Sequence, residues 1–115
     1  MTKKIIEIAC QITGVTKEEI MTQDRSRAIA DARKLAMLLC RDYTLLTYWE
    51  LGVCFERDHT TIIHACEIAN DLIFTDPAFK KMFLRAKCEV ETLGLTKVEI
   101  KRKKGFKGFI TNKAA

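Results

Sequence analysis

Five consecutive residues, Arg57 to Thr61, carry side chains that can contact the edges of nucleic-acid bases. Asp58 can accept a hydrogen bond from the amino group of cytosine, and Arg57 can donate to guanine or to a phosphate. His59 and the two threonines, Thr60 and Thr61, can contact the methyl group of thymine. A hydrophobic core needs none of these polar groups, so the cluster points to a binding surface.

The elements around this cluster place it at the start of a helix. Thr47-Tyr48-Trp49-Glu50 is a capping box, which predicts a short helix that ends near Phe55. Asp58 stands at the expected N-cap of a longer helix, His59 to Ile73, with one apolar face. A short helix, a tight connection and a longer helix form a helix-turn-helix, and its second helix presents its first residues to the major groove of DNA.

Positive charge gathers in two other segments. Residues 25–41 contain five basic residues against one acidic residue, Asp31. Residues 97–115 hold seven Lys or Arg and one Glu, a net charge of +6, whereas the first 96 residues carry −1. Such an uneven distribution favours a polyanionic partner, although basic faces that contact only solvent are also common.

The remaining pattern predicts an all-helical, compact fold of about five to six helices, followed by a basic C-terminal tail. Apolar residues recur at helical spacing over residues 3–13, 26–41 and 77–93, and Thr16-Lys17-Glu18-Glu19 forms a capping box that opens a further short helix. The length suits one domain, which we expect to end at residue 96. The tail, residues 97–115, is either disordered or contains a short strand.

Other kinds of chemistry find little support in the sequence. His59 and His64 are five residues apart, so on a helix they diverge by roughly 140° and cannot share a metal. Cys54 and His59 lack the Asp or Asn that would orient a thiol–imidazole pair. The five cysteines form no C-x-x-C pair and lie among apolar residues, which is typical of buried thiols in a reducing compartment. We therefore expect a cytoplasmic protein that is not an enzyme and has no metal, cofactor or membrane span.

The segment Arg57-Asp58-His59-Thr60-Thr61-Ile62-Ile63-His64-Ala65-Cys66 resembles the signature of the C-terminal DNA-binding domain of the bacterial replication initiator DnaA. Further segments agree with the same family: Arg25-Ser26-Arg27, Ile29-Ala30, Arg33-Lys34-Leu35-Ala36-Met37, and Glu50-Leu51-Gly52 with Phe55. The resemblance covers roughly residues 3–93 and implies an all-helical domain that binds double-stranded DNA at short asymmetric repeats of the TTATCCACA type.

The resemblance also implies a role for individual residues. The residues implied to read bases are Arg25, in the minor groove, and Asp58, His59, Thr60 and Thr61, in the major groove. The residues implied to hold phosphates are Arg27, Arg33, Lys34, Arg41, Trp49 (with the backbone that precedes it), Arg57 and His64. A structural role remains an alternative for His64, a packing role for Trp49, and a solvated helix start for the segment Arg25 to Arg27.

The chain departs from the family pattern at several positions near the expected DNA. Asp31 stands where the family usually has a basic residue, and Ala32 where it often has Pro. A single Glu56 replaces the usual Gly-Gly, Trp49 a frequent Pro, and Glu67 a frequently basic residue. The added negative charge supports an alternative function, a helical protein–protein interaction module that kept the fold but lost strong DNA binding. No G-x-x-x-x-G-K-[S/T] occurs, so nucleotide binding is not expected.

Met1 and the basic tail favour a small natural protein over a fragment of a longer initiator. Such a protein could regulate replication initiation or transcription by occupying initiator sites. The pattern leaves open which DNA sequence is bound and whether the chain is an oligomer.

Overall fold

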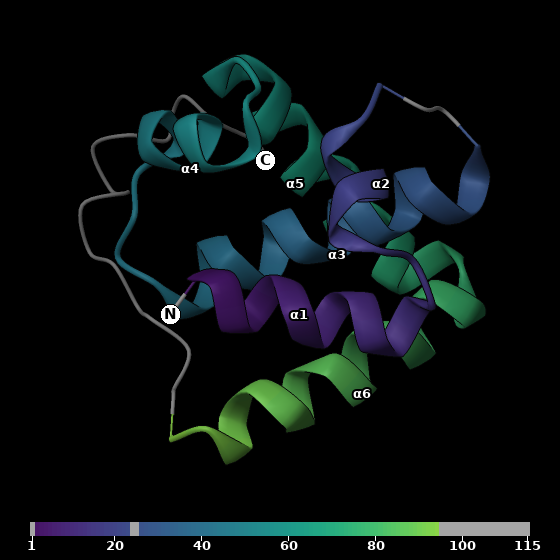
Figure 1. Cartoon of the computed structure of the whole chain (residues 1–115). Coiled ribbons are helices and arrows are strands. Elements are labelled where there is room, and N and C mark those ends of the chain that lie inside the picture. Colours follow the sequence, from purple (N-terminus) through teal and green to yellow (C-terminus); the bar gives the residue numbers. More distant parts are fainter. Residues whose placement is uncertain (1, 24–25, 95–115) are drawn as a thin grey trace.

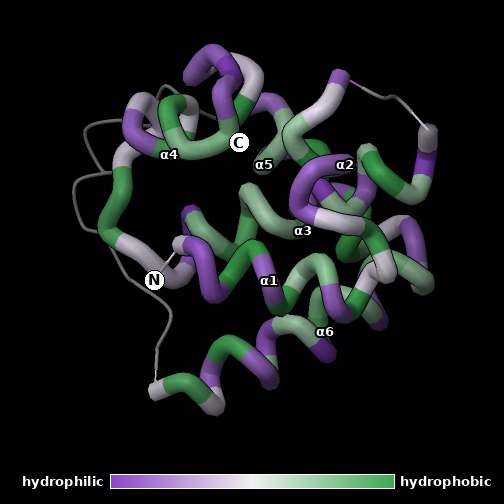
Figure 2. The backbone as a smooth tube through the Cα atoms, in the orientation of Figure 1, coloured by the Kyte–Doolittle hydropathy of each residue, from purple (hydrophilic) through white to green (hydrophobic). Residues whose placement is uncertain are grey.

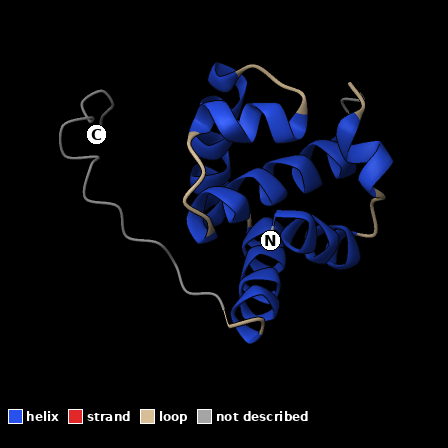
Figure 3. Cartoon of the chain, turned by 60° about the vertical axis from the view of Figure 1, so that its left-hand side comes forward, coloured by secondary structure: helices blue, strands red, loops and turns tan. Residues whose placement is uncertain are grey.

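A computed structural model describes residues 2–23 and 26–94, which form helices joined by short connections (Figure 1). The helices are α1 (Thr2–Thr13), α2 (Lys17–Met21), α3 (Arg27–Tyr43), α4 (Tyr48–Phe55), α5 (His59–Thr75) and α6 (Pro77–Thr92). Within these residues the structure contains no strand (Figure 3). The predicted all-helical fold is confirmed, with six helices in the described part of the chain.

Helix α3 is the centre of the fold, because it contacts each of the other five helices. Figure 1 shows α1 lying across α3, with α6 packed along the other side of α1. Apolar and polar residues alternate along these helices (Figure 2), as expected for helices that bury one face. The buried residues of α3 are Ile29, Ala32, Leu35, Ala36, Met37, Leu38, Leu39, Cys40 and Tyr43.

Side-chain caps define where three helices begin. Thr16 and Glu19 form a complete capping box at α2, and Thr47 and Glu50 form another at α4. In the second box the backbone N–H of Glu50 donates to the Thr47 hydroxyl at 3.2 Å, and the N–H of Thr47 donates to the Glu50 carboxylate at 2.8 Å. Asp76 caps α6 by accepting from the N–H groups of Ala78 and Phe79. These caps confirm the predicted helix starts.

Two helices extend two residues beyond their predicted ends. Helix α3 continues to Tyr43 instead of Arg41, and α5 continues to Thr75 instead of Ile73. Tyr43 is buried, and its hydroxyl donates to the carboxylate of Glu91 on α6 at 2.7 Å. This contact joins positions 48 residues apart and favours a last turn of α3 that the local sequence pattern does not signal.

The cysteines are free thiols, but burial is not common to all of them. Cys40 and Cys66 are buried, Cys10 and Cys54 are half-buried, and Cys88 on α6 is exposed, so the expectation of a buried thiol is wrong for Cys88. No helix in the described ranges has the length and apolar character needed to cross a membrane. The tail, residues 97–115, lies outside the described residues.

Candidate nucleic-acid interface

Helices α4 and α5 are joined by a tight turn and form the predicted helix-turn-helix. Glu56 has left-handed backbone angles (φ 56°, ψ 45°), and the N–H of Arg57 donates to the carbonyl of Gly52 at 2.8 Å. Gly52 is buried, and a Cβ atom added to it would lie 2.6 Å from the Arg57 carbonyl oxygen. The close approach of α4 to the start of α5 therefore depends on Gly52.

The first turn of α5 exposes several of the predicted base-reading residues. Asp58, Thr60 and Thr61 are exposed. Asp58 is the N-cap residue, as predicted, but its carboxylate makes no cap hydrogen bond and instead accepts from the Thr60 hydroxyl. This hydrogen bond lowers the pKa of the Asp58 carboxyl below its ordinary value. Asp58 is thus an ionised acceptor at neutral pH, which is what recognition of a cytosine amino group requires.

His59 is less accessible than its neighbours, because Trp49 of α4 covers it. The indole and imidazole rings stack with their centroids 3.5 Å apart and their planes at 18°. The His59 side chain is 25% exposed, whereas Trp49 is 66% exposed. The packing role expected for Trp49 is therefore confined to this surface stack and does not extend to the core.

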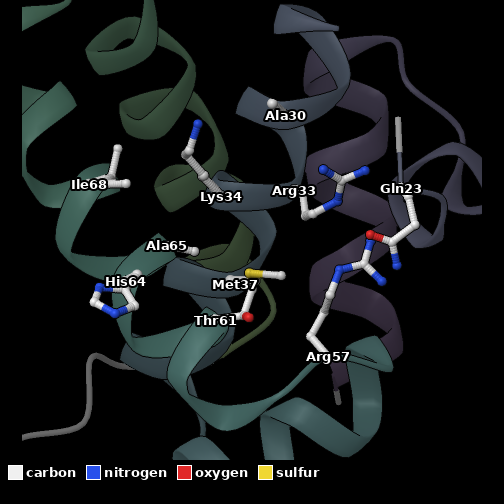
Figure 4. Close-up of a pocket in the computed structure, with 10 residues that line it drawn as sticks. All are labelled: Gln23, Ala30, Arg33, Lys34, Met37, Arg57, Thr61, His64, Ala65 and Ile68. Carbon is white, nitrogen blue, oxygen red and sulfur yellow. The ribbon is translucent and has the colours of Figure 1, made fainter. Parts of the chain in front are cut away.

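Five of the predicted contact residues line one open hollow of about 410 Å³ between α3 and α5 (Figure 4). They are Arg33, Lys34, Arg57, Thr61 and His64. Figure 4 shows Arg33 and Arg57 on the side of Gln23, with Lys34 and His64 across from them. The hollow therefore presents three permanent positive charges and a histidine next to the start of α5, an arrangement that suits a phosphate backbone.

Arg33 and Arg57 also hold the end of α2 in place. Both donate to the carbonyl of Thr22, Arg33 at 2.8 Å, and Arg33 donates a second bond to the carbonyl of Ile20 at 2.9 Å. The two guanidinium groups therefore join α2 to α3 and to the helix-turn-helix. Sequence reasoning assigned phosphate contacts to both residues and did not foresee this structural role.

Other predicted contact residues lie outside the hollow. Arg27, at the start of α3, pairs with Asp76 at 2.7 Å and with Asp31 at 3.5 Å. Arg41 lies with its guanidinium carbon 4.4 Å from the centre of the Tyr48 ring, and its Nη1 has no hydrogen-bond partner among the described residues. Arg25 lies outside the described residues.

Five residues that line the hollow were not predicted as contact residues: Gln23, Ala30, Met37, Ala65 and Ile68. Gln23, which follows α2, and Ile68 of α5 both face the hollow. For Ile68 the spacing was a usable signal, because Thr61, His64 and Ile68 recur at intervals of three and four residues and so share one helix face. His64 is 74% exposed, so it is not a buried histidine, and its Nδ1 lies 3.8 Å from a carboxylate oxygen of Glu67.

The left-handed conformation of Glu56 leads to a prediction about stability. A side chain in this region of backbone space costs about 1 kcal/mol, and glycine avoids that cost. We expect Glu56→Gly to raise the midpoint of thermal unfolding by roughly 4–8 °C, measured by circular dichroism. Glu56→Gln is the matched control, since it removes the charge but keeps the Cβ atom. An equal rise in both variants would show that the charge, and not the backbone, limits stability.

Comparison with known proteins agrees with this geometry. A sequence model of the bacterial DnaA protein helix-turn-helix matches residues 2–68, which run from α1 into α5. The match is shorter than the 3–93 expected from the sequence and leaves out the end of α5 and all of α6.

Several curated relatives carry the name chromosomal replication initiator protein DnaA. The protein from Lachnoclostridium phytofermentans is 38% identical over 77 residues, which are 66% of this chain and 17% of the relative. The protein from Symbiobacterium thermophilum is 42% identical over 77 residues, 65% of this chain and 17% of the relative. The protein from Mycobacteroides abscessus is 39% identical over 61 residues, 53% of this chain and 12% of the relative. The chain thus matches less than a fifth of the length of each of these relatives, and by the family match it belongs to the bacterial DnaA helix-turn-helix family of DNA-binding domains.

Proposed function

We propose that the chain binds double-stranded DNA at specific sequences, similar to DnaA boxes, and acts as a binding protein without catalysis. The observation that carries this proposal is the position of the first turn of α5. Its polar residues Asp58, Thr60 and Thr61 are exposed, and Thr61 also lines the basic hollow between α3 and α5. A surface with both features can read base edges and hold the adjacent phosphates at the same time.

The proposal assigns different tasks to the two parts of this surface. The first turn of α5 enters the major groove and supplies sequence preference, with Arg25 as a minor-groove contact. The basic side chains Arg33, Lys34 and Arg57 hold phosphates, which gives affinity without sequence preference. The domain comprises residues 1–96, and the basic residues of 97–115 add charge for further phosphate contacts.

A binding protein of this kind, without a bound nucleotide, would control replication initiation or transcription by occupying sites that an initiator also recognises. The part of the chain that matches is the DnaA helix-turn-helix, and this part would supply the occupancy of such sites. This role follows from the binding proposal and depends on it.

Fluorescence anisotropy with labelled duplexes tests the proposed function. One duplex contains TTATCCACA, a second has the same base composition in scrambled order, and both are titrated at several salt concentrations. We expect tighter binding to the first duplex, and affinity for both should fall as salt rises, since phosphate contacts release counterions. Absence of salt-sensitive binding at low ionic strength would contradict the proposal.

The outer face of α4 favours a second candidate function. Trp49 and Val53 lie four residues apart on this helix and are 66% and 80% exposed, so an apolar surface faces outward next to the helix-turn-helix. Such a surface suits a protein partner. If neither duplex bound, this interaction function would replace DNA binding as the leading proposal.

The ion pair between Arg27 and Asp76 leads to a prediction about affinity. Asp76 holds the guanidinium of Arg27 at 2.7 Å, so the carboxylate competes with a DNA phosphate for the same side chain. We expect Asp76→Asn to strengthen binding to all duplexes, and the slope of log affinity against log salt should steepen by about one unit. Asparagine is also a good N-cap, so α6 keeps its start.

The matched control for this prediction is Asp71→Asn on α5. Asp71 is exposed, and its substitution removes the same charge without touching Arg27. If both variants bound DNA equally well, the gain would come from net charge alone and the competition would be disproved.

A further inference from the structure

The stack of Trp49 on His59 joins the two helices of the helix-turn-helix through their side chains. The rings are 3.5 Å apart at 18°, which is parallel stacking at van der Waals contact. Trp49 is the second residue of α4, and His59 is the first residue of α5. The contact thus fixes the imidazole at the point where α5 would enter the major groove.

The stack also limits which part of the His59 side chain can contact a DNA base. Its Nδ1 is buried and has no hydrogen-bond partner among the described residues, and the nearest carboxylate oxygen, Asp58 Oδ1, is 3.6 Å away. One face of the imidazole is covered by the indole. Only the remaining quarter of the side-chain surface is open to a base. The direction in which His59 presents this edge is therefore set by Trp49.

We infer that Trp49 is a specificity-determining positioning residue, which holds the His59 ring so that its exposed edge meets one particular base of the bound duplex. This inference rests on the proposed function, because it needs a duplex that the first turn of α5 reads. It differs from a phosphate contact at Trp49, since its effect appears in the choice of one base and not in affinity for DNA in general.

Selection of bound duplexes from a random pool tests the inference, with the wild-type chain, Trp49→Ala, Trp49→Phe, His59→Ala and the double variant. We expect Trp49→Ala to reduce the preference at a single base position by about 2- to 10-fold. His59→Ala should flatten the preference at the same position, and the double variant should lose no more than His59→Ala alone. Trp49→Phe should keep the preference, because phenylalanine can still stack on the imidazole.

A measurement without DNA checks the stack in solution. The chain has two histidines, so His59 and His64 are easily distinguished by proton NMR. The ring protons of His59 should be shifted by the indole ring current in the wild type, and the shift should be lost in Trp49→Ala. His64 is the internal control, because it lies five residues farther along α5 and is 74% exposed. An unshifted His59 in the wild type would overturn the inference.

The outcomes separate this inference from the proposed function. A wild-type chain that enriches no sequence would overturn both. If the wild type selects a site and Trp49→Ala keeps the same base preference, only the inference fails. An equal loss for all sequences, or a change at a different base from that of His59→Ala, would also overturn it.

Discussion

Gly52→Ala should destabilise the domain by about 2 kcal/mol and lower its midpoint of thermal unfolding by roughly 10 °C. The added Cβ atom would lie 2.6 Å from the Arg57 carbonyl oxygen and 3.4 Å from the backbone nitrogen of His59. Backbone atoms of a tight turn cannot move aside as a flexible side chain can. The start of α5 must therefore shift away from α4, which also displaces the residues expected to contact DNA.

The expected loss of stability is opposite in sign to the change that helix propensity predicts for Gly52→Ala. By helix propensity alone, replacing a glycine inside a helix with alanine stabilises it by about 1 kcal/mol. Val53→Ala is the matched control, because it places alanine at the next residue of α4, whose side chain is 80% exposed. Thermal unfolding of both variants, followed by circular dichroism, checks the prediction. A more stable Gly52→Ala variant would mean that the turn tolerates a wider approach of the two helices.

Thr61→Ala should lose sequence preference while it keeps general affinity for DNA. Thr61 is exposed on the first turn of α5 and lines the basic hollow, so it is placed to contact a base edge. Loss of one base contact costs about 1–3 kcal/mol on the best site and little on random duplex. Anisotropy titrations of the variant and the wild type with the TTATCCACA duplex and with the scrambled duplex measure the loss on the specific site and the loss on random DNA.

Lys34→Ala is the matched control for this prediction. Lys34 lines the same hollow from α3, where its ammonium group is placed to hold a phosphate as a point charge. Its loss should weaken binding to both duplexes by similar factors and flatten the salt slope by about one unit. If Thr61→Ala behaved in the same way as Lys34→Ala, the assignment of base reading to the first turn of α5 would be wrong.

Asp58→Asn extends the test to the identity of the base. Asparagine keeps the N-cap preference and can still accept from Thr60, but it replaces an acceptor-only carboxylate with a group that also donates. Asparagine pairs best with adenine, so preference should move from cytosine towards adenine at one position of the selected site. Unchanged selection would show that Asp58 does not face a base.

The helices and their starts could be predicted from the sequence because their signals are local. Thr47 and Glu50 lie three residues apart and form the capping box of α4 as the pattern indicates. Asp76 followed by Pro77 marks the start of α6 in the same way. The resemblance to the DnaA family implied DNA contacts for Thr61, His64 and Lys34, and the structure brings these three residues to one hollow.

The partners of individual site residues could not be predicted, because they come from distant parts of the chain. Arg27 pairs with Asp76, which is 49 residues away, and Arg57 donates to Thr22, which is 35 residues away. No local periodicity reports such contacts. The stack of Trp49 on His59 crosses the turn, and its geometry depends on how closely Gly52 lets the two helices approach.

Helix α3 carries both the centre of the core and two of the basic residues, Arg33 and Lys34, which are followed directly by buried Leu35. A mutation that changes the volume of the core at Leu35 would thus move the adjacent charges. In the first turn of α5, in contrast, Thr60 and Thr61 are exposed and can change without repacking the core. During evolution, substitutions at Thr60 and Thr61 could therefore give related chains new DNA sequence preferences without affecting the fold. Arg33 and Lys34 are more constrained, because selection for folding preserves the part of α3 that carries them.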